Sequence, residues 1–149
     1  MLPIDRITDV PGIQFTRFHR VLTNDEYAAY VADDEERLLS APDDNRIVVL
    51  IDAMNYLKGN AAQRKMSTEF HEAHEEALQR QVIAVVFIAD SLIIRGALQA
   101  MQWFAPMPYP FEVAATIDKA LVRTDAHLIK AGLAALLPEH KERILSLYA

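Results

Sequence analysis

Hydrophobic residues gather in short runs along the chain, and segments with helical spacing separate these runs. Two runs are continuous rather than alternating: residues 46–52 (RIVVLID) and residues 82–89 (VIAVVFIA). A continuous run rich in β-branched residues is typical of a strand covered on both faces, as in a parallel sheet. Weaker patterns predict an outer, irregular strand within residues 12–22 and a short strand at Phe111–Val113.

Helical segments lie between these strands. Thr23 and Glu26 have the spacing of a capping box, so a helix is expected from there to about Ser40. Its acidic run at residues 33–36 (DDEE) is expected to be a solvated face. Asn60 can cap a second helix. The apolar stripe of that helix consists of Met66, Phe70, Ala73 and Ala77.

The chain ends in further helices. Thr116 can cap one helix and Pro138 suits the first turn of another, so C-terminal helices are expected from about 116 to 147. Strands therefore alternate with helices over most of the chain. This alternation predicts an α/β fold: a single domain over residues 1–149, with a small, mainly parallel or mixed sheet of about four or five strands flanked by helices.

The helix expected at residues 92–104 has more apolar surface than one sheet can cover. Its polar side chains, Arg95, Gln99 and Gln102, form a single narrow stripe. This helix could be buried beneath the C-terminal helices, could bind a partner or a second copy of the chain, or could cover a cavity for an apolar ligand. The residues expected at the interaction surface are Ile94, Leu98, Met101, Trp103, Met107 and Tyr109.

Composition excludes several classes of protein. The chain has 149 residues, 52% of them hydrophobic and 24% charged, which does not fit a disordered tail. Its 15 basic and 21 acidic residues give a net charge of −6, so nucleic acid is not an expected partner. Without cysteine there is no disulfide framework, which fits a cytoplasmic location. The longest apolar run is far shorter than the roughly 20 residues of a membrane span, and no secretory signal is expected.

Few residues have the pattern of a catalytic site. Asp52 and Asp90 each end a buried strand, at the sheet edge where ligands often bind, but capping and loop stabilisation explain both more simply. His71 and His74 are three residues apart and could face one metal, but the spacing is not that of a zinc motif and a third ligand is missing. No phosphate-binding glycine loop or nucleophile elbow occurs. We therefore predict no catalytic residue, no metal and no cofactor.

Several local motifs together resemble a known family. They are Leu-Thr-x-x-Glu-Tyr at 22–27, a buried strand ending at Asp52, Ala-Asp-Ser at 89–91, Arg-Gly at 95–96, Trp-Phe-x-Pro-x-Pro at 103–108, and a helix with Asp118, Ala120 and Leu121. Over roughly residues 12–125 the chain resembles the SpoIIAA-like branch of the STAS superfamily, the sulfate-transporter and anti-sigma-factor-antagonist domains. This resemblance implies a non-enzymatic regulatory or scaffolding domain that acts through protein–protein interaction, as a homodimer or with a regulatory protein. The branch is also compared with CRAL-TRIO lipid-binding proteins, which implies the alternative of a carrier for a small apolar or lipid ligand.

The same resemblance draws attention to one serine. Phosphorylated regulators of the superfamily place a serine in an Asp-Ser-x-Gly-type loop after a buried strand, and Asp90 and Ser91 have this context. However, Leu92 follows directly, and the glycine that would loosen the loop comes only at Gly96. Phosphorylation of Ser91 is therefore a hypothesis, and a simple role as a helix cap is the alternative.

Overall fold

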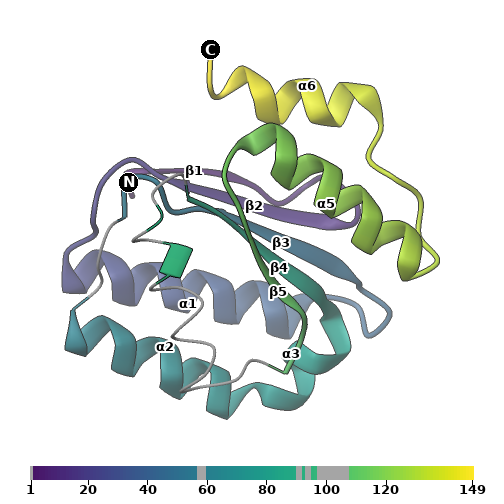
Figure 1. The fold of residues 1–149 in the computed structure, drawn as a ribbon. Coiled ribbons are helices and arrows are strands. Elements are labelled where there is room, and N and C mark those ends of the chain that lie inside the picture. The colour runs from purple at the N-terminus through teal and green to yellow at the C-terminus, as the bar shows by residue number, and fades with distance from the viewer. Residues whose placement is uncertain (1, 57–59, 90–91, 93–94, 97–107) are drawn as a thin grey trace.

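Five strands form one sheet in the order in which they occur in the chain (Figure 1). The computed structural model describes residues 2–56, 60–89, 92, 95–96 and 108–149. The strands are β1 (Ile4–Ile7), β2 (Ile13–Phe18), β3 (Ile47–Asp52), β4 (Val82–Ile88) and β5 (Phe111–Ala114). The helices that the described residues form are α1 (Asn24–Ser40), α2 (Ala61–Ala73), α3 (Glu75–Gln81), α5 (Ile117–Lys130) and α6 (Pro138–Ser146).

The sheet is mixed. Strands β2 to β5 run parallel to one another, whereas β1 pairs antiparallel with β2 at one edge. The predicted α/β class with a small, mainly parallel sheet is confirmed. The sequence patterns did not predict β1. The strand expected within residues 12–22 is β2 (Ile13–Phe18), and its expected place at the outside of the sheet is wrong, because β1 pairs with its free edge.

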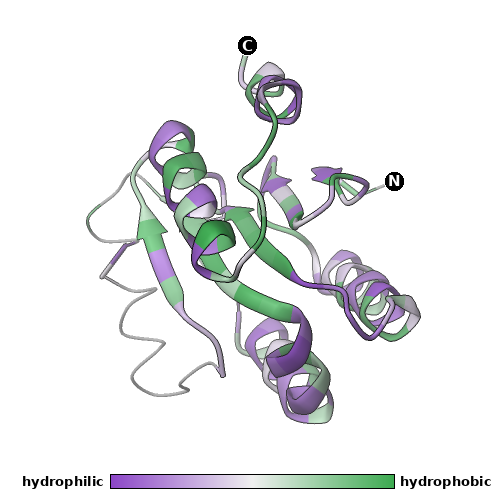
Figure 2. Ribbon diagram, turned by 90° about the vertical axis from the view of Figure 1, so that its right-hand side faces the viewer, coloured by the Kyte–Doolittle hydropathy of each residue, from purple (hydrophilic) through white to green (hydrophobic). Residues whose placement is uncertain are grey.

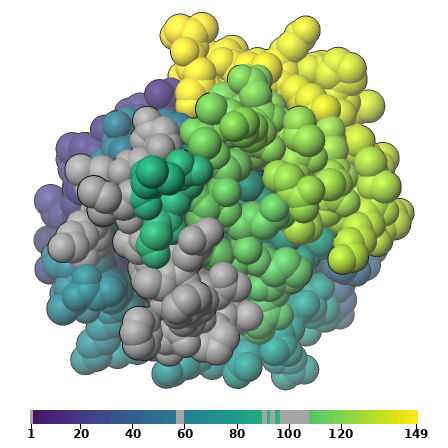
Figure 3. Space-filling view, in the orientation of Figure 1, coloured from purple at the N-terminus to yellow at the C-terminus, as the bar shows by residue number. Residues whose placement is uncertain are grey.

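The helices divide between the two faces of the sheet (Figure 1). Connections between neighbouring parallel strands almost always cross with the same hand. Since the strand order runs in one direction only, α1, α2 and α3 all lie on one face. The opposite face is covered by α5 and α6, which follow the last strand and form one side of the molecular surface (Figure 3). In the part of the chain that the structure describes, no helix is both long and apolar enough to cross a membrane.

The predicted starts of α1, α2, α5 and α6 are confirmed, whereas the two residues that precede the helix predicted at residues 92–104 lie outside the described residues. The Thr23 hydroxyl accepts a hydrogen bond from the Glu26 backbone N–H (3.2 Å), and the Glu26 carboxylate accepts one from the Thr23 N–H (2.9 Å), which completes the capping box. Asn60 and Thr116 cap α2 and α5 with their side chains, and Pro138 occupies the first turn of α6. These caps supply acceptors for N–H groups that have no partner within the helix.

The single helix predicted after Asn60 is wrong in one respect, because the segment forms two helices. His74, with φ −122° and ψ 23°, leaves the helical conformation and separates α2 from α3. The apolar stripe therefore changes direction at His74, with Phe70 on one side of the break and Ala77 on the other.

The two faces of the sheet are packed differently. On the α5 face the inward-facing residues of the two central strands are fully buried. They are Val48 and Leu50 of β3 and Val86 and Ile88 of β4, all 0% exposed, and Leu128 of α5, in the same cluster, is 1% exposed. On the α1–α3 face the alternate positions of β3, at Ile47, Val49 and Ile51, are only partly buried. The apolar strands nevertheless occupy the layer between the two groups of helices (Figure 2). The α5 face is thus one continuous core. The α1–α3 face instead has two smaller buried clusters, one of Leu78, Val82, Val85 and Tyr109 and one of Phe18, Leu22 and Tyr30.

Candidate functional site

A cavity of about 1590 Å³ lies between the sheet and helices α1, α2 and α3. Most of its described wall is apolar. These residues include Ile13, Phe18, Val31, Leu38, Ile47, Val49, Ile51, Phe70, Leu78, Val82, Val85 and Phe87. Pockets for small molecules usually measure about 300–1000 Å³, so this cavity has more than enough room for a small ligand.

The cavity opens to solvent, because several of its lining side chains are exposed, among them Asp9, Arg64, Glu72 and Glu75. Without a ligand it therefore holds water, and an apolar ligand that displaces water from an apolar wall gains free energy.

Aromatic rings close one end of the cavity. Phe18 at the end of β2 contacts Tyr30 and Tyr56 edge-on, with ring centroids 5.3 and 4.8 Å apart. Tyr27 lies 5.8 Å from Tyr30 and 6.4 Å from Tyr56. Four large rings from β2, α1 and the loop after β3 thus stand between the helix layer and the sheet. Ring pairs of this kind add specific contacts to the burial of apolar area.

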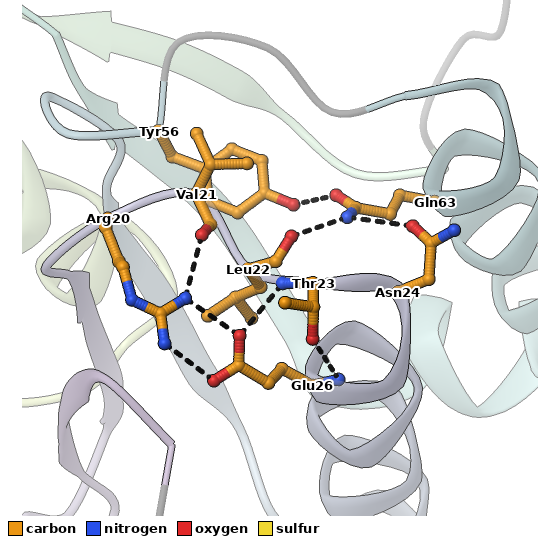
Figure 4. Close-up of polar contacts among 8 residues, drawn as sticks. All are labelled: Arg20, Val21, Leu22, Thr23, Asn24, Glu26, Tyr56 and Gln63. Carbon is orange, nitrogen blue, oxygen red and sulfur yellow. Dashed lines mark hydrogen bonds and ion pairs between the residues drawn. The ribbon is translucent and has the colours of Figure 1, made fainter.

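A buried glutamine fixes the start of α2 at the same end (Figure 4). Gln63 is 2% exposed, and its side-chain N–H group donates to the Leu22 carbonyl (2.8 Å) and to Asn24 Oδ1 (3.2 Å). Its Oε1 atom accepts a hydrogen bond from the Tyr56 hydroxyl. The side chain therefore connects α2 to the loop before α1 and to the aromatic cluster.

The start of α1 is further stabilised outside the cavity. The Arg20 guanidinium donates two hydrogen bonds to the Glu26 carboxylate, at 2.8 and 2.9 Å (Figure 4). Arg20, together with the Thr23 N–H group, lowers the pKa of Glu26 to about 2. The capping box thus includes a carboxylate that stays ionised in mild acid.

A histidine–tyrosine pair lies at the α2 side of the cavity. His71 Nδ1 is 2.7 Å from the Ser67 carbonyl oxygen, so this nitrogen donates. In the neutral ring, Nε2 then accepts from the Tyr109 hydroxyl at 2.9 Å. Burial raises the pKa of Tyr109 to about 12. Tyr109 is 8% exposed and packs with Leu78, so its ring lies inside this chain rather than on the expected interaction surface.

An ion pair lies beside the cavity wall at the edge strand. Asp34 of α1 accepts hydrogen bonds from the Arg6 guanidinium of β1 and from Gln14 Nε2 (3.3 Å). Burial raises the pKa of Asp34, and the neighbouring Arg6 opposes this shift. The expectation that residues 33–36 form a purely solvated face is therefore wrong at Asp34. Its partner comes from β1, the strand that the sequence patterns did not predict.

The two candidate metal ligands do not share a site. His74 Nε2 is hydrogen-bonded to Glu35 of α1 (2.8 Å), whereas His71 binds Ser67 and Tyr109. Within the described residues, no three His, Cys, Asp or Glu side chains are grouped as metal ligands. Both histidines instead join α2 to a neighbouring segment.

Asp52 lies on the opposite face of the sheet from the cavity. It is 1% exposed, and Oδ1 accepts from the Met54 N–H (3.0 Å) while Oδ2 accepts from the Tyr148 hydroxyl (2.5 Å). Burial, and then this hydrogen bond, raise the pKa of Tyr148. The Arg17 guanidinium lies 4.2 Å from the centre of the Tyr148 ring and donates to the Leu147 carbonyl. Asp52 therefore holds the segment after α6 against the ends of β2 and β3.

Most of the predicted surface residues cannot be placed. Asp90, Ser91, Ile94, Leu98, Met101, Trp103 and Met107 lie outside the described residues. The predicted interaction surface and the phosphorylation hypothesis for Ser91 therefore remain predictions.

Sequence patterns did not identify the cavity, although they provided some of its residues. The apolar stripe predicted for the second helix includes Phe70, which lines the cavity. Nothing in an apolar stripe distinguishes side chains that pack against a sheet from side chains that face a cavity. A sequence signal for the cavity does exist. Aromatic and polar residues such as Tyr27, Tyr56 and Gln63 occur at positions that line the cavity, where a tightly packed core would have aliphatic residues.

Comparison with solved structures identifies the architecture. The chain is similar to an uncharacterised protein of the DUF3478 family from Shewanella loihica PV-4, whose crystal structure has a SpoIIAA-like fold. The two share 18% sequence identity, with a TM-score of 0.61 over 83% of this chain and 92% of the other. The chain has a SpoIIAA-like fold. Neither family models nor curated protein sequences gave a match.

The SpoIIAA-like fold agrees with the resemblance drawn from the sequence motifs. It accounts for the parallel strands β2 to β5 and for the helices on both faces of the sheet. At 18% sequence identity this similarity shows the fold alone and assigns no activity or partner to the chain.

Proposed function

We propose that this SpoIIAA-like protein is a non-enzymatic binding protein that holds a small apolar molecule between its sheet and helices α1–α3. The observation that supports this is the one-sided packing of the sheet. Neighbouring residues of β3 differ in environment: Val48 is 0% exposed in the α5 core, whereas Val49 lines the cavity. A chain selected only for stability would fill both faces, because unfilled apolar space is costly.

The arrangement of the cavity fits ligand binding better than catalysis. Its half-buried polar side chains are paired within the protein, as in Tyr109 with His71 and Tyr56 with Gln63. The buried carboxylate of Asp52 faces the other side of the sheet, where Tyr148 covers it. The described wall therefore offers a shaped apolar surface. In the His71–Tyr109 pair on this wall, burial raises the pKa of Tyr109 to about 12, so its hydroxyl stays protonated at neutral pH and is a poor nucleophile.

Regulation through a protein partner, or as a homodimer, remains a prediction that rests on the apolar segment at residues 92–104. Of the six residues expected at that surface, only Tyr109 is described, and it is buried. A regulatory role is compatible with ligand binding, because an occupied cavity can differ from an empty one in its affinity for a partner.

A pair of matched variants tests the proposal. Val49→Trp places an indole in the cavity, and Ile129→Trp introduces an indole on the outer face of α5, where Ile129 is 62% exposed and lines no pocket among the described residues. Binding of the uncharged fluorescent probe N-phenyl-1-naphthylamine is measured by titration, and circular dichroism verifies folding. We expect the wild type and Ile129→Trp to bind the probe equally and Val49→Trp to bind at least ten-fold more weakly. Equal binding by both folded variants would show that the cavity is not the binding site.

A further inference from the structure

The hydrogen bonds of the cavity wall indicate what kind of ligand fits, an inference that rests on the proposed function. Each end of the cavity has polar side chains, but they are already paired. Gln63 binds Leu22 and Asn24, Gln81 Nε2 donates to the Leu38 carbonyl (3.1 Å), and His71 binds Tyr109 (2.9 Å). Among the described residues, no cavity-lining side chain has a buried nitrogen or oxygen without a hydrogen-bond partner.

Because these lining side chains are already hydrogen-bonded within the protein, they provide few hydrogen-bond partners for the polar head group of a ligand. A ligand hydroxyl or carboxylate among these side chains would have to break an existing bond or stay unpaired. An unpaired buried polar group costs about 1–3 kcal/mol, and a charged one costs more. The wall therefore favours hydrocarbon in its interior.

The ionisable side chains around the cavity also favour an uncharged ligand. Four carboxylates line it against two guanidinium groups: Asp9, Asp34, Glu72 and Glu75 against Arg37 and Arg64. Arg37 is hydrogen-bonded to Asp33 (3.0 Å) and to the Thr8 hydroxyl (2.7 Å). The Asp34 carboxylate is paired with Arg6. Asp9 is paired with Arg143 (2.8 Å), and Glu72, Glu75 and Arg64 are exposed to solvent, where water screens their charges. The charged groups of the described lining are therefore paired within the protein or screened, and they offer an ionised head group little attraction.

We propose that the cavity selects an uncharged, mostly hydrocarbon molecule, such as a long-chain alcohol or another neutral lipid, over fatty-acid anions and phospholipids. Shape and volume bring the ligand in, and an ionised head group would lose its hydration beside described side chains that are already paired or that face solvent. An ammonium head group gains little either, because Arg6 already neutralises Asp34.

Three ligands with the same chain separate these head groups. Decanol, decanoate and decylamine compete with N-phenyl-1-naphthylamine for the wild-type protein at pH 8, below their critical micelle concentrations. We expect decanol to displace half of the probe at a concentration at least ten-fold lower than decanoate, and lower than decylamine. Decanoate or decylamine acting at the same concentration as decanol, or a lower one, would overturn the inference while leaving the proposed function intact.

The results that would contradict the proposed function differ from those that would contradict only the selectivity for uncharged ligands. If the probe does not bind, or none of the three ligands displaces it, the cavity takes no apolar ligand, and both proposals are wrong. If decanoate competes as well as decanol, an apolar ligand does bind and only the selectivity is wrong.

A variant with an added charge in the cavity tests the selectivity for uncharged ligands independently. Val31 lines the cavity from α1, so Val31→Lys adds a cation to the apolar part of the wall. Ile129→Lys is the control on the exposed face of α5, where Ile129 is 62% exposed. We expect Val31→Lys to narrow the preference for decanol over decanoate at least five-fold and Ile129→Lys to leave it unchanged. An unchanged preference in folded Val31→Lys would contradict the charge argument. If Val31→Lys does not fold, the comparison of the three ligands on the wild type still decides.

Discussion

Two adjacent valines on β3 should respond very differently to the same substitution. Val48 is fully buried against α5, and Val49, the next residue, faces the cavity. Val48→Ala and Val49→Ala remove the same two methyl groups from the same strand. Changes in strand propensity and in the unfolded chain are therefore nearly matched, and the difference between the variants reports the packing of the two faces.

The expected magnitudes follow from this environment. For Val48, the loss of two buried methyl groups at about 0.8 kcal/mol each, plus a cavity term, lowers the free energy of unfolding by about 2.5 kcal/mol. For Val49, the methyl groups already border the cavity and are only partly buried, so the loss should be below about 1 kcal/mol. The two variants should thus differ by at least about 1.5 kcal/mol.

Urea unfolding followed by circular dichroism measures both values. Coincident transitions by a second probe, such as tyrosine fluorescence, check that unfolding is two-state, and an unchanged m-value shows that the same surface is exposed. Equal losses of stability in Val48→Ala and Val49→Ala would refute the reasoning, because they would mean that the α1–α3 face is packed as tightly as the α5 face.

Three further predictions concern other parts of the fold. Tyr148→Phe removes the hydrogen bond to the buried Asp52 carboxylate and should lower the free energy of unfolding by about 2 kcal/mol; a loss below about 0.5 kcal/mol in urea unfolding would contradict this. Glu26, whose pKa falls from 4.5 to about 2 on folding, stabilises the fold above pH 4.5, and this contribution is lost as the pH falls through about 2. The difference in melting temperature between the wild type and Glu26→Gln should therefore be larger at pH 6 than at pH 2.5, and a constant difference would argue against it. Gly12→Ala should destabilise more than Gly132→Ala in thermal unfolding, since both have positive φ but only at Gly12 would the new Cβ meet a side chain, at 3.2 Å; the reverse order would count against this.

Local sequence patterns predicted most of the elements. The caps at Thr23, Asn60 and Thr116 are side-chain choices that depend only on the first turn of each helix. The continuous apolar runs of β3 and β4 reflect strands covered on both faces. Such signals are local, so they can be found without knowledge of the rest of the fold.

The features that were missed depend on distant contacts. The segment of β1 is four residues long and becomes a strand only by pairing with β2. Asp34 lies in an acidic run, and only the presence of Arg6 on β1 draws it into the interior. The cavity is missed for the same reason, because Val48 and Val49 are identical in the sequence and differ only in what lies above each face.

The order of the strands also affects how the chain can fold as it is synthesised. Each strand pairs with the one before it, so the sheet can extend strand by strand as residues leave the ribosome. The helices that follow β2 and β3 cover one side at once, but α5 comes only after β5. At roughly 5–20 residues per second, the apolar face of β3 waits several seconds for its cover. That interval, rather than the finished fold, is when this chain is most exposed to aggregation and has most to gain from a chaperone.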